Sequence, residues 1–171
     1  MLPWSGLAVV WQAAATGRCR LAKLGADLSV AAGPVDMTVG ACTEPQVAWL
    51  AGPRRIVVAA EDASTAGLYA AVWDDALAPT VAPTLVAPRA HAVRIVADGD
   101  GAWVVWARYD DDAVQYARLG PDGAAQLGPA IGVLDTALPH YHMLQRVDGS
   151  TVVIWLDVAH NRSYAATRLC L

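Results

Sequence analysis

The chain has 171 residues, of which 56% are hydrophobic and 16% charged, so it is long enough for one domain with a core and too apolar for a disordered segment. Its formal net charge of -4, with no cluster of Lys and Arg, argues against a nucleic-acid surface. Arg, Asp or Gly interrupts every apolar stretch before it reaches the length of a membrane-spanning helix.

The first six residues lack the basic head and apolar middle of a signal peptide. We therefore expect either a cytoplasmic chain or one whose leader lies outside this sequence. The cysteines leave two alternatives open. Either Cys19 pairs with Cys42 in a disulfide and leaves Cys170 alone, or all three are reduced and buried.

A short apolar motif recurs along the chain. Its four copies, the second of them weaker, start 48, 47 and 49 residues apart: Val9-Val10-Trp11, Val57-Val58-Ala59, Val104-Val105-Trp106 and Val153-Ile154-Trp155. A second motif keeps nearly the same spacing, with steps of 48, 47 and 48 residues between Leu21, Tyr69, Tyr116 and Tyr164. Two independent motifs with one period indicate repeat units at 1–42, 43–89, 90–137 and 138–171, the first and last incomplete.

Each complete unit is predicted to hold four short antiparallel strands. In the third unit, the most regular, these strands are 91–97, 102–109, 113–119 and 129–134. The turns between them read Asp-Gly-Asp-Gly, Asp-Asp-Asp and Gly-Pro-Asp-Gly, which are typical of hairpins.

The second strand of the units is apolar on both faces. In the third unit one face carries Trp103, Val105 and Tyr109, and the other carries Ala102, Val104 and Trp106; Leu7, Val9 and Trp11 alternate with Ala8 and Val10 in the same way. A sheet built around such strands must be covered on both sides. Proline collects in the last strand, at Pro34, Pro83 and Pro129, which indicates an outer edge because proline cannot donate to a ladder.

These features predict an all-β fold, namely a β-propeller or partial propeller of about four blades of four-stranded antiparallel sheets. A β-sandwich or prism is the alternative, although neither requires a regular repeat of this length.

The stretch from Gly101 to Gly123 has a sequence pattern that is similar to a known kind of repeat. It opens on a Gly-x-x-Val-x-Trp pattern and continues with Tyr116, Arg118-Leu119 and an Asp-Gly turn. This unit resembles the blades of bacterial β-propeller repeat proteins, which are often secreted or displayed on the cell surface. The resemblance implies the architecture and a secreted or cell-surface location. It implies no activity, because propellers host unrelated functions.

The predicted strands are too few to complete a propeller ring of four full blades. The first unit begins almost at its second strand and the fourth ends after its third, whereas a closed ring usually needs about four complete blades. We expect a compact four-blade ring, a piece of a longer propeller, or a homodimer in which two chains complete one another. A partial propeller whose ends are covered by something else is favoured.

The most suggestive polar residues fall where the innermost strand of a unit is expected to start, near the mouth of the central channel. They are Glu44, Gln46, His91, His140, Tyr141 and His142. Residues two apart on a strand share a face, so His140 and His142 would point the same way, yet zinc needs a third ligand. We predict a ligand-binding rim without a metal or cofactor; ordinary, partly exposed polar residues are the alternative.

Other sequence patterns give weaker evidence for a functional site. Asp110-Asp111-Asp112 offers carboxylates to calcium but lacks the spacing of a calcium loop, so a solvated turn is expected. No serine stands in a Gly-x-Ser-x-Gly context, and no phosphate-binding loop is present. Trp11, Trp106 and Trp155 are expected in the core between blades.

We therefore expect a non-enzymatic binding or scaffolding module that holds a protein, peptide or glycan on one rim, with no nucleic-acid partner and no membrane span. One alternative is a propeller-type hydrolase or lyase with its site around His91, His140 and His142. The other is a structural fragment without a site of its own.

Overall fold

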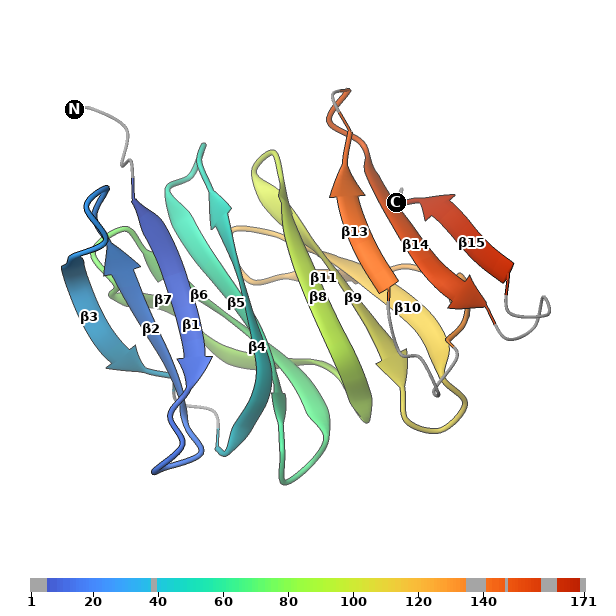
Figure 1. Cartoon of the computed structure of the whole chain (residues 1–171), viewed down its shortest axis with the longest axis horizontal. Helices are drawn as coiled ribbons and strands as arrows, with labels where there is room; N and C mark the ends of the chain where they lie inside the picture. The colour runs from blue at the N-terminus through green and yellow to red at the C-terminus, as the bar shows by residue number, and fades with distance from the viewer. Residues whose placement is uncertain (1–5, 38–39, 135–140, 147, 158–162, 170–171) are drawn as a thin grey trace.

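The computed structural model describes residues 6–37, 40–134, 141–146, 148–157 and 163–169. These residues contain no helix. They form four antiparallel sheets that follow one another in chain order (Figure 1). Strands that are neighbours in sequence pair with each other, so each sheet is a meander that needs only short turns.

The first sheet runs β1 (Leu7–Gln12), β2 (Cys19–Leu24) and β3 (Val30–Asp36). The second sheet runs β4 (Cys42–Leu50), β5 (Arg55–Asp62), β6 (Gly67–Asp74) and β7 (Pro79–Ala87). The third runs β8 (Ala90–Asp98), β9 (Gly101–Arg108), β10 (Ala113–Leu119) and β11 (Ala125–Leu127), and β12 (Gly132–Val133) also pairs with β10. The fourth runs β13 (Tyr141–Gln145), β14 (Thr151–Asp157) and β15 (Ser163–Arg168).

The sheets stand side by side as propeller blades. β1 lies against β4, β4 against β8, and β8 beside β13, so successive blades meet through the first strand of each. In Figure 1 the first blade, in blue, and the fourth, in orange and red, lie at opposite ends of the array. The protein is thus all-β and built of four antiparallel propeller-like blades. Within the described residues the first and last blades have three strands each.

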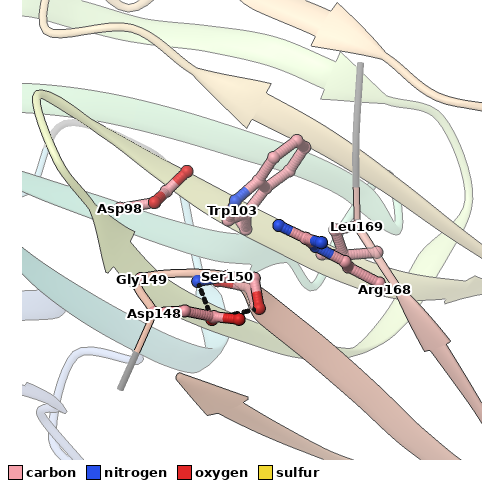
Figure 2. Close-up of a pocket in the computed structure, with 8 residues that line it drawn as sticks. Asp98, Trp103, Asp148, Gly149, Ser150, Arg168 and Leu169 are labelled. Atoms are coloured by element: carbon pink, nitrogen blue, oxygen red, sulfur yellow. Dashed lines mark hydrogen bonds between the residues drawn. The ribbon is translucent and has the colours of Figure 1, made fainter. Parts of the chain in front are cut away.

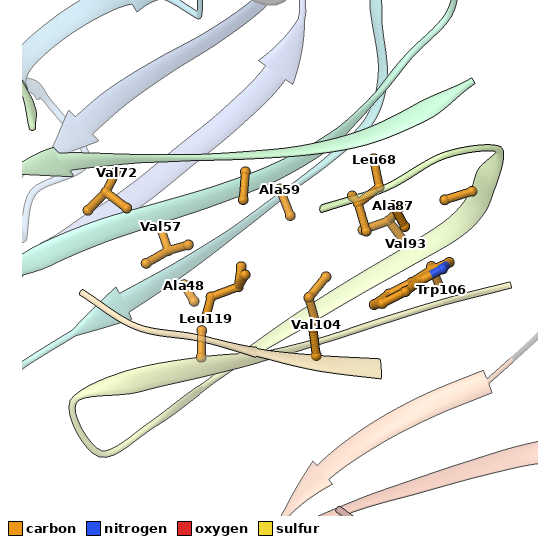
Figure 3. Packing of buried hydrophobic residues seen from close by; sticks show 14 of the residues in the cluster. Ala48, Val57, Ala59, Leu68, Val72, Ala87, Val93, Val104, Trp106 and Leu119 are labelled. Atoms are coloured by element: carbon orange, nitrogen blue, oxygen red, sulfur yellow. The ribbon is translucent and has the colours of Figure 1, made fainter. Parts of the chain in front are cut away.

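Three clusters of buried apolar side chains fill the three spaces between successive blades. Between the second and third blades, Val57 and Ala59 of β5 meet Val104 and Trp106 of β9 (Figure 3). The alternate residues of β9, including Trp103, Val105 and Ala107, belong instead to the cluster between the third and fourth blades. Both faces of β9 are therefore covered, as its two apolar faces predict.

The second blade departs from the predicted repeat by one residue. Val104 and Trp106 face the preceding blade, whereas their expected equivalents, Val57 and Ala59, face the following one. The β5 residues that face the preceding blade are Ile56, Val58 and Ala60. A shift of one residue turns a side chain to the other face of a strand. The structural counterpart of Val104-Val105-Trp106 in this blade is therefore Val58-Ala59-Ala60.

Proline lies at the outermost strand of the first three blades. Pro34 is within β3 and Pro83 within β7. In place of the strand predicted at 129–134 the structure has two shorter pieces, β11 before that range and β12 within it, and Pro129 falls between them. A proline has no N–H to give to β10, so the ladder breaks at that point. Tyr109, predicted on β9, lies just beyond its end and is 47% exposed.

A disulfide joins the first two blades. Cys19 of β2 and Cys42 of β4 are bonded, with Cα atoms 5.6 Å apart, and both side chains are buried. Cys170 lies outside the described residues.

The tryptophans of the repeat differ in burial. Trp106 and Trp155 are 1% and 3% exposed and belong to the clusters between blades, as predicted. Trp11, at the same place in the first blade, is only half-buried. In the part of the chain that the structure describes, no helix is long and apolar enough to cross a membrane.

Candidate functional site

One end of the blades gathers polar side chains. In a meander the first strand starts where the second ends and the third starts, so residues from these places meet at one rim. Glu44 lies near the start of β4, Glu61 near the end of β5 and His91 near the start of β8. Tyr109 and Asp112 lie in the turn between β9 and β10. These five residues are termed the acidic rim below.

Two β-bulges set the direction of the first side chains. The pairing of β4 with β5 shifts around Glu44, whose φ is 47°, and the pairing of β8 with β9 shifts between His91 and Arg94, with Ala92 at φ 56°. Positive φ is uncommon for residues other than glycine, and bulges recur next to binding sites. Oε2 of Glu44 accepts a hydrogen bond from the Val93 N–H at 3.2 Å, so the two bulges are tied together.

Tyr109 connects the third blade to the second. Its hydroxyl donates a hydrogen bond to Oε1 of Glu61 at 2.9 Å. Its ring centroid lies 4.6 Å from that of the His91 imidazole, and Nε2 of His91 lies 3.2 Å from Oδ1 of Asp112. Glu61 is only 7% exposed, although the tyrosine ring above it is open to solvent. The result is an accessible aromatic ring backed by an imidazole and carboxylates.

The rim carries negative charge without a matching cation. The pKa of Tyr109 is raised to about 12, first by burial and then by the hydrogen bond to Glu61 and the charges of Glu61 and Glu44. Among the described residues neither glutamate pairs with Lys or Arg. In the neighbouring turn Asp110 and Asp111 do pair, with Arg89 and Arg108. The charges of the two glutamates are therefore not balanced by a Lys or Arg of the described residues, whereas the ion-pair partner of Asp112 is the His91 imidazole.

The predicted ligand-binding residues separate into two groups. Glu44 and His91 come together at the acidic rim, and Gln46 follows on β4, half-buried opposite Ala59. Tyr141 is buried at the start of β13, where its hydroxyl donates to the Val105 carbonyl at 2.9 Å. Burial raises the pKa of Tyr141, which fits a residue of the core. Tyr141 is thus not accessible to a ligand.

The histidine pair is not assembled with His91. His142 is exposed, and because it follows Tyr141 on β13 it points to the opposite face, away from the third blade. His140 lies outside the described residues. Within the described ranges no group of three or more His, Cys, Asp or Glu side chains is placed to hold a metal ion.

Three members of the acidic rim were not predicted from the sequence. Glu61 is the last residue but one of the mostly apolar strand β5. Asp112 belongs to the acidic turn that we assigned to solvent, and Tyr109 comes directly before that turn. The turn assignment is correct for Asp110 and Asp111, which pair with their own arginines. The one sequence signal that could have identified Glu61 is an acidic residue inside a strand that is otherwise mostly apolar.

A pocket of about 550 Å³ opens at the opposite end of the blades, between the third and fourth (Figure 2). It is lined by Asp98, Trp103, Asp148, Gly149, Ser150, Thr151, Arg168 and Leu169. Asp148 accepts hydrogen bonds from the hydroxyl and N–H of Ser150, at 2.6 and 3.0 Å, and these lower its pKa. Asp98 lies 3.8 Å from Arg118, and Asp148 lies 3.7 Å from Arg146. The pocket carboxylates therefore have cations beside them, unlike those of the acidic rim.

Comparisons with known proteins show no family for this chain. No protein-family model matches the chain, and no curated protein does. An endo-1,4-beta-xylanase from Bacteroides thetaiotaomicron VPI-5482 is 14% identical, with a TM-score of 0.46, over 96% of this chain and 71% of that one. A GH43 endo-arabinanase from Bacillus licheniformis is 9% identical, with a TM-score of 0.40, over 92% and 67%.

Proposed function

We propose that the protein is a non-enzymatic binding module whose acidic rim holds a protein or peptide through a Lys or Arg side chain. The observation that carries the proposal is the exposed ring of Tyr109, flanked by Glu44 and Glu61, two carboxylates without a cation of their own in the described chain.

The ring supplies the first part of such a site. A cation over the face of a tyrosine is attracted by the negative charge of the π system, by about 0.5–1 kcal/mol where the site is exposed. His91 packs against Tyr109 with its ring tilted by 33°, and its contact with Asp112 holds it there. The tyrosine is therefore supported from one side and open on another.

The carboxylates supply the second part. Glu44 is exposed and is held by the Val93 N–H, while Glu61 is held by the Tyr109 hydroxyl. Both oxygens are thus positioned before a ligand arrives, which lowers the entropy cost of binding. A guanidinium or ammonium group would satisfy them, and hydrogen bonds between charged groups are about twice as strong as neutral ones.

Nearby cations do not occupy the site. Arg89 and Arg108 pair with Asp110 and Asp111. Arg94 donates to the Val93 carbonyl at 2.7 Å and lies over the ring of Tyr141, 5.8 Å from its centroid. These arginines have partners of their own, so the charge of the two glutamates is left for a ligand.

Binding of short peptides tests the proposal. Two peptides that differ only by a central Arg or Gln would be titrated into the protein, with chemical-shift changes followed by NMR. We expect the Arg peptide to bind and shift the Tyr109 ring signals, and the Gln peptide to bind at least about tenfold more weakly. Glu44→Gln should weaken binding of the Arg peptide, because it removes one of the unbalanced charges.

The matched control is Asp27→Asn. It removes the same charge from an exposed carboxylate in the turn after β2, where Asp27 accepts hydrogen bonds from the N–H and the hydroxyl of Ser29. Equal affinity for both peptides, or equal weakening by the two variants, would reject the proposal.

The hydrolase or lyase hypothesis is the outcome to be excluded. It would place chemistry at His91, His140 and His142, and its most direct substrates to try are xylan and arabinan, because the two similar structures are named for activity on them. Release of reducing sugar that His91→Ala abolishes would replace the binding module by an enzyme. Binding of these glycans without turnover would replace the peptide by a glycan.

A further inference from the structure

We propose that the first blade of one copy packs against the fourth blade of a second copy, through two sheet faces that no described part of the chain covers. This inference does not depend on the acidic rim. It rests on how the blades inside the molecule already pack.

The first blade has one covered and one uncovered face. Ala8 and Val10 of β1 pack into the cluster with the second blade. Because side chains alternate along a strand, Leu7, Val9 and Trp11 point the other way. Leu7 is exposed, and Val9 and Trp11 are half-buried. Isolated exposed apolar residues are ordinary, but a contiguous set on one sheet face marks an interaction surface.

The fourth blade is uncovered on its far side. Val153 and Trp155 of β14 pack into the cluster with the third blade. Ile154, between them, points away together with its strand neighbours Val152 and Leu156, and all three are half-buried. Leu144 lies opposite Val152 and Tyr164 opposite Leu156, so both belong to the same face, and both are exposed.

The repeat shows how the two faces fit. Trp106 and Trp155 follow the same apolar pair in their blades, face the preceding blade and are buried against it. Trp11 stands at the same position of the first blade, with its indole on the side where a preceding blade would lie. Ile154 and its neighbours lie on the side of the fourth blade where a following blade would pack. A second copy that brings these faces together repeats a contact the molecule makes three times within itself.

Such a contact joins two different surfaces. Contacts of this type close into a ring if the rotation between copies allows it, and otherwise extend into longer assemblies. Each copy then uses its first blade on one neighbour and its fourth blade on another. The two faces can therefore be disabled separately, and this makes a decisive experiment possible.

The experiment is light scattering after size exclusion, over a range of protein concentrations. The unmodified chain should have a mass of two or more times 17.9 kDa at about 100 µM. Trp11→Arg alone and Ile154→Arg alone should each have the mass of one copy or assemble far more weakly. An equimolar mixture of the two should recover a mass of twice 17.9 kDa and no more, because each copy keeps one working face.

Controls keep the outcome interpretable. Gln126→Arg places the same charge on the exposed strand β11 and should assemble like the unmodified chain. Leu7→Arg and Leu144→Arg repeat the pair at exposed positions, where folding is not at risk, and circular dichroism checks each variant. A single-copy mass for the unmodified chain would overturn the proposal. So would a variant mixture that stays at single-copy mass, or Ile154→Arg assembling normally, since the first blades would then meet each other.

Discussion

The hydroxyl of Tyr109 and the carboxylate of Glu61 are 48 residues apart in the chain and 2.9 Å apart in space. Glu61 lies near the end of the second strand of one blade, and Tyr109 follows the second strand of the next, so the hydrogen bond spans one repeat. The polar chemistry of the acidic rim therefore depends on the stacking of two blades, and neither hairpin would hold it alone.

Removing the charge of Glu61 should change the titration of Tyr109. The pKa of Tyr109 is raised to about 12, first by burial and then by its bond to Glu61. Glu61→Gln should lower this pKa towards 10.0 without reaching it, because burial remains. Phenolate absorbance measures it, with the matching Tyr109→Phe variants subtracted in each background. An unchanged midpoint would contradict the role given to Glu61.

The same shift has a consequence for stability. A pKa that is higher in the folded than in the unfolded chain contributes stability that is fully present below about pH 10 and is lost as the pH rises towards about pH 12. Tyr109→Phe should remove this part of the alkaline loss. Urea unfolding at several alkaline pH values compares the two proteins.

The blade repeat could be predicted because of how blades are packed. A strand covered on both sides, such as β9, must be apolar at successive positions, and this leaves the Val-Val-Trp motif visible in the sequence. The one-residue displacement of the second blade could not be predicted. Val57-Val58-Ala59 and Val58-Ala59-Ala60 are both apolar, and only the contacts with neighbouring blades distinguish them.

The acidic rim was predictable only in part, for a related reason. The positions of Glu44 and His91 at this end of the blades could be predicted because each stands near the start of a first strand, which is a local feature. Glu61 and Tyr109 meet through contacts between blades, and no local pattern marks such a pair. Tyr141 was misplaced because its ring belongs to the core, where its hydroxyl donates a hydrogen bond to the Val105 carbonyl.

Asp75 should be the most sensitive carboxylate of the contact between the first two blades. Lys23 of β2, only 7% exposed, and Arg54 both donate to it, and Lys23 Nζ also donates to the Asp75 carbonyl at 2.6 Å. Asp75→Asn leaves the buried ammonium without its carboxylate, which should cost about 2–3 kcal/mol of unfolding free energy at neutral pH. Urea unfolding measures it.

The pH dependence of this loss in stability follows from the lowered pKa of Asp75. The hydrogen bond from Lys23 is the largest cause of the lowered pKa, and the hydrogen bond from Arg54 is the next. A lowered pKa gives stability that is present above the unfolded value, near 3.8, and lost as the pH falls through the folded value. The difference between the two proteins should therefore shrink in acid. Asp36→Asn, which breaks an exposed pair with Arg20, is the control and should cost below about 1 kcal/mol. Equal losses for both variants would contradict the prediction.

The disulfide between Cys19 and Cys42 should stabilise the first two blades through the unfolded state. The cysteines are 23 residues apart, and a loop of that length predicts about 3 kcal/mol. Urea unfolding with and without a reductant measures this difference. The double variant Cys19→Ser with Cys42→Ser should be less stable than the oxidised protein and unaffected by the reductant. If the reductant leaves the unmodified protein unchanged, the bond makes no such contribution.

Gly132 should tolerate no side chain, because of the tryptophan it faces. A Cβ at Gly132 would enter the Trp155 indole, which is buried between the third and fourth blades. Gly132→Ala forces the indole or β12 to move, and overpacking of this kind costs about 1–3 kcal/mol. Gly52→Ala is the matched control, since a Cβ there meets nothing within 4 Å. Thermal and urea unfolding of both variants measure the difference. If the two alanines had equal effects, the indole would have room to shift, and the packing between these blades would be looser than its burial indicates.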